Sequence, residues 1–301
     1  MTRPWRWLHG AALAALTASL IGCGIAQFVP GVDDSAKLHQ QAQAALARWA
    51  AAVTAAGGPT AFIPVGDRTV QVGDWEAAVG DNDKQALMAG LVLSTIPLGT
   101  APPPDGRVHW PDGTTSTVGL ISAQQALMDL RTDADGSACS TCEPLQIVKA
   151  ELTSGPVGTS RGTAQAPVWQ FDLQGTAVRI ARLAVASSIT VTPPAWDPDN
   201  PPVGIAINSA TGSSSGRRLT VGFVGAPAPA DQGCGADYTA EAVESSDAVV
   251  VIVIEHRNPG LGACTAVGAL RTATVELAEP LGNRAVLDVQ QGLPVAVQPA
   301  P

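Results

Sequence analysis

The clearest helical pattern lies in residues 35–53, where apolar residues recur at steps of three and four. Asp33, Asp34 or Ser35 can cap the beginning of this helix, and Gly57, Gly58 and Pro59 end it. The pattern predicts an amphipathic helix that buries one face. The apolar positions on that face are Leu38, Ala42, Ala45, Leu46, Trp49 and Val53.

The pattern changes to strands and turns after a less regular region. In residues 60–100 it predicts only an extended stretch over 62–72, a helix over 84–89 and a strand over 91–96. Residues 107–120 form two short alternating runs around Asp112-Gly113, which is typical of a β-hairpin. Ser122 and Gln125 have the spacing of a capping box, so a helix should follow them.

The remainder of the chain is rich in strand patterns. Residues 248–254 are an unbroken apolar run, too short to span a membrane, and we interpret them as a central strand buried on both faces. The other predicted strands are residues 145–152, 168–173, 178–185, 189–191, 219–224, 242–243, 272–277, 285–289 and 294–297. Strands and helices do not alternate as a doubly wound sheet requires, so the fold class predicted is α+β, mostly β, with antiparallel sheets.

Residues 193–202 contain five prolines and mark the clearest break in the pattern. Proline stiffens the chain and removes backbone donors, so this segment is either a linker or a crossover that follows the protein surface. We therefore expect an α+β domain over residues 35–192 and a β-rich domain over residues 203–301.

The first 22 residues have a different character. Arg3 and Arg6 precede an apolar stretch of 14 residues, 8–21, which is shorter than the roughly 20 residues that a membrane span needs. The stretch ends in Leu20-Ile21-Gly22-Cys23. This ending resembles the lipobox of bacterial lipoproteins, in which the cysteine receives a diacylglyceryl group and becomes the first residue after cleavage.

The resemblance implies a signal peptide over residues 1–22, a lipidated tether over 23–34 and attachment to the outer face of the cell membrane. Two acyl chains, palmitate among them, make such an anchor effectively permanent. The remainder of the chain is also similar to uncharacterised lipoproteins of high-GC Gram-positive bacteria, in residues 108–113, 167–171 and 280–284. That similarity implies no particular activity.

Composition supports the extracytoplasmic location and limits the partners. Without residues 1–22 the formal charge changes from −9 to −11, because that segment contains two arginines and no acidic residue. An acidic surface with three lysines argues against nucleic acid as a partner. The four cysteines after Cys23 are an even number, as expected in an oxidising compartment. Proximity favours Cys139–Cys142 and Cys234–Cys264 among the three possible pairings.

No motif identifies a catalytic or metal site. Residues 158–162 and 212–216 both match G-x-S-x-G, but each is followed by a predicted strand, whereas a nucleophile elbow needs a helix there. Cys139 and Cys142 match C-x-x-C, but nearby acidic residues would raise the thiol pKa, so a structural disulfide is the better interpretation.

The isolated histidines and closely spaced aspartates do not have the spacing of a metal site, and turn chemistry explains the aspartates. Tryptophans are expected mainly as core residues, with Trp196 the candidate for an exposed role. The residues considered for metal binding are His39, His109, His256, Asp133, Asp135, Asp197, Asp199 and Asn200.

We therefore expect no cofactor and no metal, and a non-enzymatic binding or structural module that contacts an unknown envelope component or partner protein. The alternative is a hydrolase of cell-wall or secreted substrates without a readable motif. A solute-binding component of a transporter is disfavoured because repeated βα units are absent.

Overall fold

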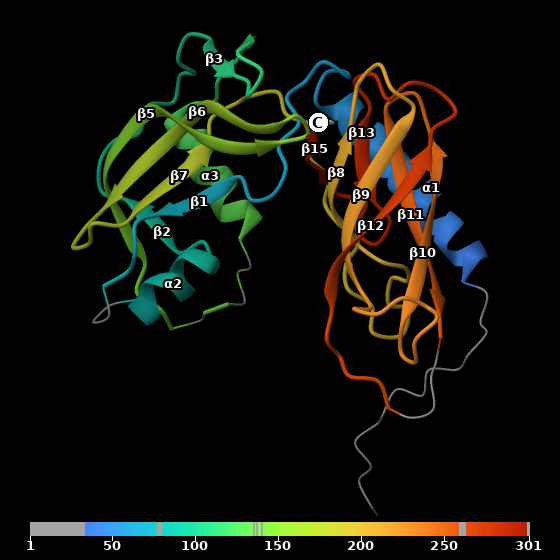
Figure 1. Cartoon of the computed structure of the whole chain (residues 1–301). Coiled ribbons are helices and arrows are strands. Elements are labelled where there is room, and N and C mark those ends of the chain that lie inside the picture. The colour runs from blue at the N-terminus through green and yellow to red at the C-terminus, as the bar shows by residue number, and fades with distance from the viewer. Residues whose placement is uncertain are drawn as a thin grey trace, which may run out of the picture. The chain divides into compact units, whose positions relative to one another are not determined.

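A computed structural model describes residues 34–76, 80–134, 136, 138–139, 141–258 and 263–299. The predicted lipobox with Cys23, the signal peptide and nearly all of the tether lie outside the described residues, as does Asp135. In the described part the protein combines three helices with three sheets, which confirms the α+β, mostly β class (Figure 1). None of the described helices is long and apolar enough to cross a membrane.

A seven-stranded sheet comes first along the chain. Its neighbouring strands run β1-β7-β6-β3-β4, while β5 pairs with β6 and β2 pairs with β5. The bounds are β1 Thr69–Val72, β2 Val92–Ser94, β3 Gly106–His109, β4 Thr115–Val118, β5 Leu145–Thr159, β6 Gly162–Leu173 and β7 Arg179–Leu183. Two helices, α2 Gly80–Met88 and α3 Ala123–Asp133, contribute buried residues to a core that includes Phe171 and Ile180 of this sheet.

The two local signals near this sheet are confirmed. β3 and β4 form the predicted hairpin, and Gly113 in its turn has a φ of +81°, a conformation that favours glycine. Ser122 caps α3 by accepting a hydrogen bond from the Gln125 backbone N–H. Only that half of the capping box forms, because the Gln125 side chain donates to Asp129 instead.

Two four-stranded sheets follow, in the orders β10-β11-β13-β14 and β12-β9-β8-β15. Their strands are β8 Ile207–Gly212, β9 Arg218–Gly225, β10 Ala236–Glu244, β11 Ala248–Arg257, β12 Ala269–Glu276, β13 Ala285–Asp288, β14 Pro294–Val295 and β15 Val297–Gln298. Most pairings are antiparallel, as expected, but β11 with β13, β8 with β15 and β2 with β5 run parallel.

β11 is the central strand that its apolar run predicts. Val249, Val251 and Val253 point into a core shared with Leu219, Val221 and Phe223 of the other sheet. The alternate residues Ala248, Val250 and Ile252 point to the opposite face, where they pack with Trp49. This alternation explains why both faces of the strand are apolar, since each face packs into a separate core.

The second core is closed by α1, Ser35–Ala55, which lies along β10 and β11 (Figure 1). Ala42, Ala45, Trp49 and Val53 form its buried face, as the periodicity predicts. The helix thus packs on strands of the C-terminal third rather than on the first sheet. The domain boundary predicted at residues 193–202 stays a prediction. The strands that α1 packs on, β10 and β11, come after that boundary in the chain.

Residues 193–202 follow the surface. Most of the segment is exposed, and the Lys37 ammonium donates to the Pro201 carbonyl. Beside it, the Gln41 side chain bonds both backbone groups of Val203. Of the two interpretations left open, a crossover along the surface of α1 therefore matches these contacts. Residues 189–191, expected as a strand, form none, while Ser188 makes a single bridge to Phe62.

Candidate functional site

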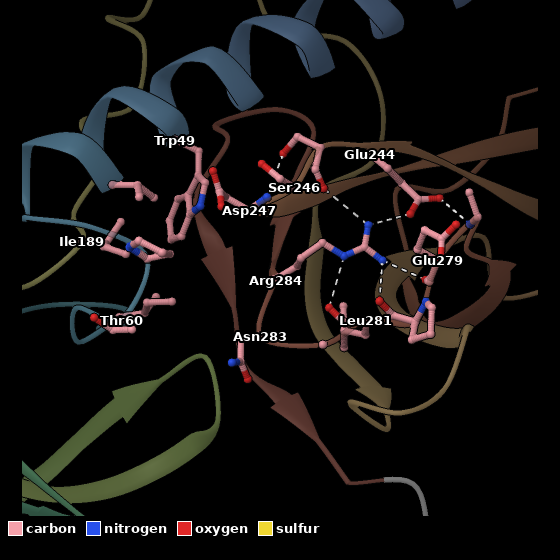
Figure 2. A pocket seen from close by; sticks show the side chains of 17 residues that line it. Trp49, Thr60, Ile189, Glu244, Ser246, Asp247, Glu279, Leu281, Asn283 and Arg284 are labelled. Atoms are coloured by element: carbon pink, nitrogen blue, oxygen red, sulfur yellow. Dashed lines mark hydrogen bonds and ion pairs between the residues drawn. The ribbon is translucent and has the colours of Figure 1, made fainter.

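A cavity with a volume of about 600 Å³ lies at one end of the α1-covered sheet. Trp49 and Val53 of α1 form one wall, and the turn between β10 and β11 forms another. The loop between β12 and β13 closes the side opposite the helix (Figure 2). Its apolar lining comprises Trp49, Val53, Pro59, Ile63, Ile189, Pro280 and Leu281.

Arg284 shapes the loop that closes the cavity. Its guanidinium donates to the carbonyls of Leu281, Glu279 and Pro280, so one side chain fixes the path of this loop. The same group pairs with Glu244 at 2.6 Å between Nη1 and Oε2 (Figure 2). All three guanidinium nitrogens are bonded within the protein, so Arg284 is a structural cation here and has no nitrogen left for a ligand.

Glu244 is held by both of its carboxylate oxygens. Oε1 accepts from the Ala278 backbone N–H at 2.6 Å, and Oε2 pairs with Arg284. Burial alone would raise the pKa of Glu244, but the Ala278 backbone N–H, Arg284 and the Glu279 backbone N–H together outweigh it, and the pKa is lowered. The carboxyl group therefore stays ionised and is not a proton donor at neutral pH.

Other polar groups at the cavity have no partner among the residues that the structure describes. The carboxylates of Asp247 and Glu279 form no ion pair with a described residue, and the Asn283 side chain makes no hydrogen bond to one. The Trp49 side chain is 1% exposed, and its indole N–H has no acceptor among the described residues. Figure 2 places this ring beside Asp247 at the cavity wall. The site thus offers apolar walls with a negatively charged rim.

Both G-x-S-x-G matches are hairpin turns. Ser160 lies between β5 and β6, and Ser214 lies between β8 and β9, so neither serine begins a helix. In the first turn, Arg161 stacks over Trp110 at 4.2 Å from the ring centroid and pairs with Asp112. The geometry of a nucleophile elbow is absent from both turns, which agrees with the interpretation of these motifs as chance matches.

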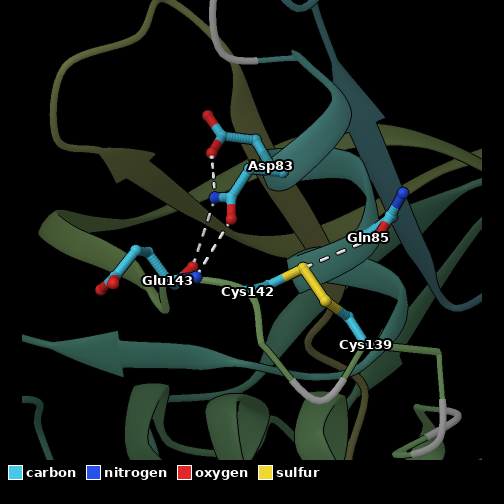
Figure 3. Close-up of a disulfide and its surroundings, with 6 residues drawn as sticks. Asp83, Gln85, Cys139, Cys142 and Glu143 are labelled. Carbon is cyan, nitrogen blue, oxygen red and sulfur yellow. Dashed lines mark hydrogen bonds between the residues drawn. A yellow bond between two sulfur atoms is a disulfide. The ribbon is translucent and has the colours of Figure 1, made fainter.

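The expected cysteine pairs are the ones that form. Cys139 and Cys142 are joined with Cα atoms 5.8 Å apart, and Cys234 and Cys264 with Cα atoms 5.5 Å apart. Beside the first pair, the Glu143 backbone N–H donates to Asn82 of α2, which holds the loop against that helix (Figure 3). The C-x-x-C motif is therefore a structural disulfide in this fold.

The histidines and aspartates are dispersed. His39 contacts Glu241, and His256 bonds Thr239. Asp133 is bound by both Arg68 and Arg182, so it is occupied by cations of the protein itself. The Asp197 carboxylate accepts from a backbone N–H two residues later in a turn, as turn chemistry predicts. Within the described ranges, no group of three or more potential metal ligands occurs.

The tryptophans divide as expected between core and surface. Trp49 is buried, and Trp169 donates its indole N–H to the Ile121 carbonyl. Trp196 is 72% exposed in the proline-rich segment.

The sequence offered no signal for the cavity itself, because Trp49, Asp247 and Arg284 are far apart in the chain. Comparison with protein-family models, curated proteins and solved structures finds no match to this chain.

Proposed function

We propose that this protein is a lipid-anchored binding module of the cell envelope that holds a small, largely apolar molecule in the cavity beside Trp49. The anchor is the diacylglyceryl group expected on Cys23. The observation that carries the binding role is the cavity of about 600 Å³, whose size is within the range of small-molecule sites. Its apolar walls supply the driving force for taking such a molecule from water.

The charge around the cavity selects among such molecules. Asp247 and Glu279 are carboxylates that have no cationic partner in the described part of the chain, and the arginine of the lining is neutralised by Glu244. An anionic ligand would meet unbalanced negative charge at the rim, and desolvating that ligand would cost further energy. The ligand is therefore uncharged or cationic.

A substitution at Ser246 tests this role. Ser246 lies in the β10–β11 turn, lines the cavity and is exposed, so Ser246→Trp should obstruct the cavity without disturbing a core. We expect the protein to bind the neutral apolar dye Nile red at one saturable site. Ser246→Trp should weaken that binding by about tenfold or more, equivalent to a loss of about 1.4 kcal/mol.

Ser154→Trp is the matched control, because Ser154 is an exposed serine of β5 away from the cavity lining. This variant carries the same added surface and should bind the dye as the unchanged protein does. Fluorescence titration measures both affinities. Equal dye binding by the two variants would place the dye elsewhere and remove the support for the cavity.

A further inference from the structure

Three exposed apolar side chains lie where β9 ends and its antiparallel neighbour β12, the edge strand of the sheet, begins. Val224 and Leu270 are directly paired across the two strands, and both face outward, with exposed fractions of 56% and 82%. Val267, at 62%, precedes Gly268, which lies against Val224. We refer to Val224, Val267 and Leu270 as the apolar patch. The remaining outward positions of β12 are polar, namely Thr272, Thr274 and Glu276.

The contacts of Tyr238 locate this patch relative to β10. Tyr238 lies near the beginning of β10, its hydroxyl accepts from the Ala226 backbone N–H, and Arg271 stacks over its ring. The patch therefore lies at the end of the sandwich where β10 begins. The Cys234–Cys264 disulfide joins the segments that precede β10 and β12, so it cross-links the end of the sandwich at which the patch lies.

The contacts of α1 show in which direction the helix runs relative to β10. His39, near the beginning of α1, lies 3.4 Å from Glu241 in the middle of β10. Trp49, two to three turns later, lines the cavity together with Glu244, the last residue of β10, and Asp247 in the turn that follows. The helix thus begins opposite the middle of β10 and runs alongside this strand towards the cavity end (Figure 1).

We propose that the apolar patch rests in the surface of the lipid bilayer to which the chain is anchored, with the cavity facing away from it. This inference depends on the lipid anchor of the proposed function. Eleven residues lie between Cys23 and Ser35, and the twelve Cα–Cα steps span at most about 43 Å, which is enough for the patch end of the fold to reach the membrane. The cavity end is about 26 Å farther along β10.

The chemistry of the patch fits the apolar part of the membrane rather than charged headgroups. Without residues 1–22 the chain carries a net charge of −11, so a bilayer rich in anionic lipid would repel it. Leu270 and the two valines offer apolar surface, and the neighbouring Arg271 is turned onto the Tyr238 ring. Contact with a zwitterionic bilayer through shallow insertion is the mode that this combination supports.

A dye at two positions of β12 tests the orientation. The mature, lipidated protein is reconstituted in phosphatidylcholine vesicles after Leu270→Cys is labelled with nitrobenzoxadiazole, a dye whose emission reports polarity. The control is Thr274→Cys with the same label, on the same exposed face but about 13 Å farther along the strand. We expect the label at position 270 to emit at shorter wavelength and to be quenched several-fold more strongly by lipids that carry an acyl-chain spin label.

The outcomes separate this inference from the anchor on which it depends. Identical emission and quenching at the two positions, in protein that floats with the vesicles, would overturn the patch inference and leave the anchor intact. Protein that carries no lipid and does not float with the vesicles would overturn both. Strong quenching at position 274 with none at position 270 would reverse the proposed orientation.

Discussion

Replacing Arg284 by methionine should lower the free energy of unfolding by about 2–3 kcal/mol, because it leaves Glu244 as an unpaired, partly buried carboxylate. The two side chains are 10% and 18% exposed, so solvent screens their interaction only weakly. The variant also removes the donors that bind the carbonyls of the 279–281 loop. Urea or thermal unfolding monitored by circular dichroism measures the change.

Arg218→Met is the control for this substitution. Arg218 lies 3.7 Å from Glu276, but the two side chains are 79% and 64% exposed, so the pair should contribute within about 0.5 kcal/mol. The comparison separates the loss of a buried pair from the loss of any arginine. If Arg284→Met destabilises the protein no more than Arg218→Met, then Arg284 does not organise the cavity loop as inferred.

Removing the Cys234–Cys264 disulfide by Cys234→Ser with Cys264→Ser should cost about 3–4 kcal/mol, because this bond closes a loop of 30 residues in the unfolded chain. The bond also secures the turn at Cys234, which has a positive φ of 66°. Next to it, a Cβ on Gly235 would lie against the Pro229 carbonyl. Denaturant unfolding of the oxidised protein and of the variant gives the difference.

The Cys139–Cys142 pair provides the comparison. It spans only three residues, so the same entropic argument gives a stabilisation about 2 kcal/mol smaller. The variant Cys139→Ser with Cys142→Ser should therefore unfold at a higher denaturant concentration than the other double variant. The opposite order would show that local packing against α2, rather than loop closure, determines the contribution of each bond.

Local signals in the sequence predicted several elements correctly. The three- and four-residue steps identified α1, the Asp112-Gly113 pair identified a hairpin, and the apolar run at 248–254 identified the central strand. Each of these signals depends on neighbours within the same segment. Steric and hydrophobic preferences between residues a few positions apart can be identified directly from the sequence.

Features that depend on distant partners were not predicted. β8, Ile207–Gly212, was missed because its small polar residues do not alternate clearly, and pairing with β9 and β15 makes it a strand. The periodicity of α1 identified its buried face but not the strands that cover it. The cavity joins Trp49 to residues about 200 positions later, and no spacing rule connects positions so far apart.

The mass of the intact mature protein, extracted from the membrane of cells that express it, tests the central claim most directly. The account predicts a chain that begins at Cys23 and carries a diacylglyceryl group on that residue, with the other four cysteines oxidised in two disulfides. Reduction should add the mass of four hydrogen atoms, two for each disulfide, and leave the lipid in place. An unmodified N-terminus at any residue other than Cys23 would contradict the anchor and the orientation of the cavity that depends on it.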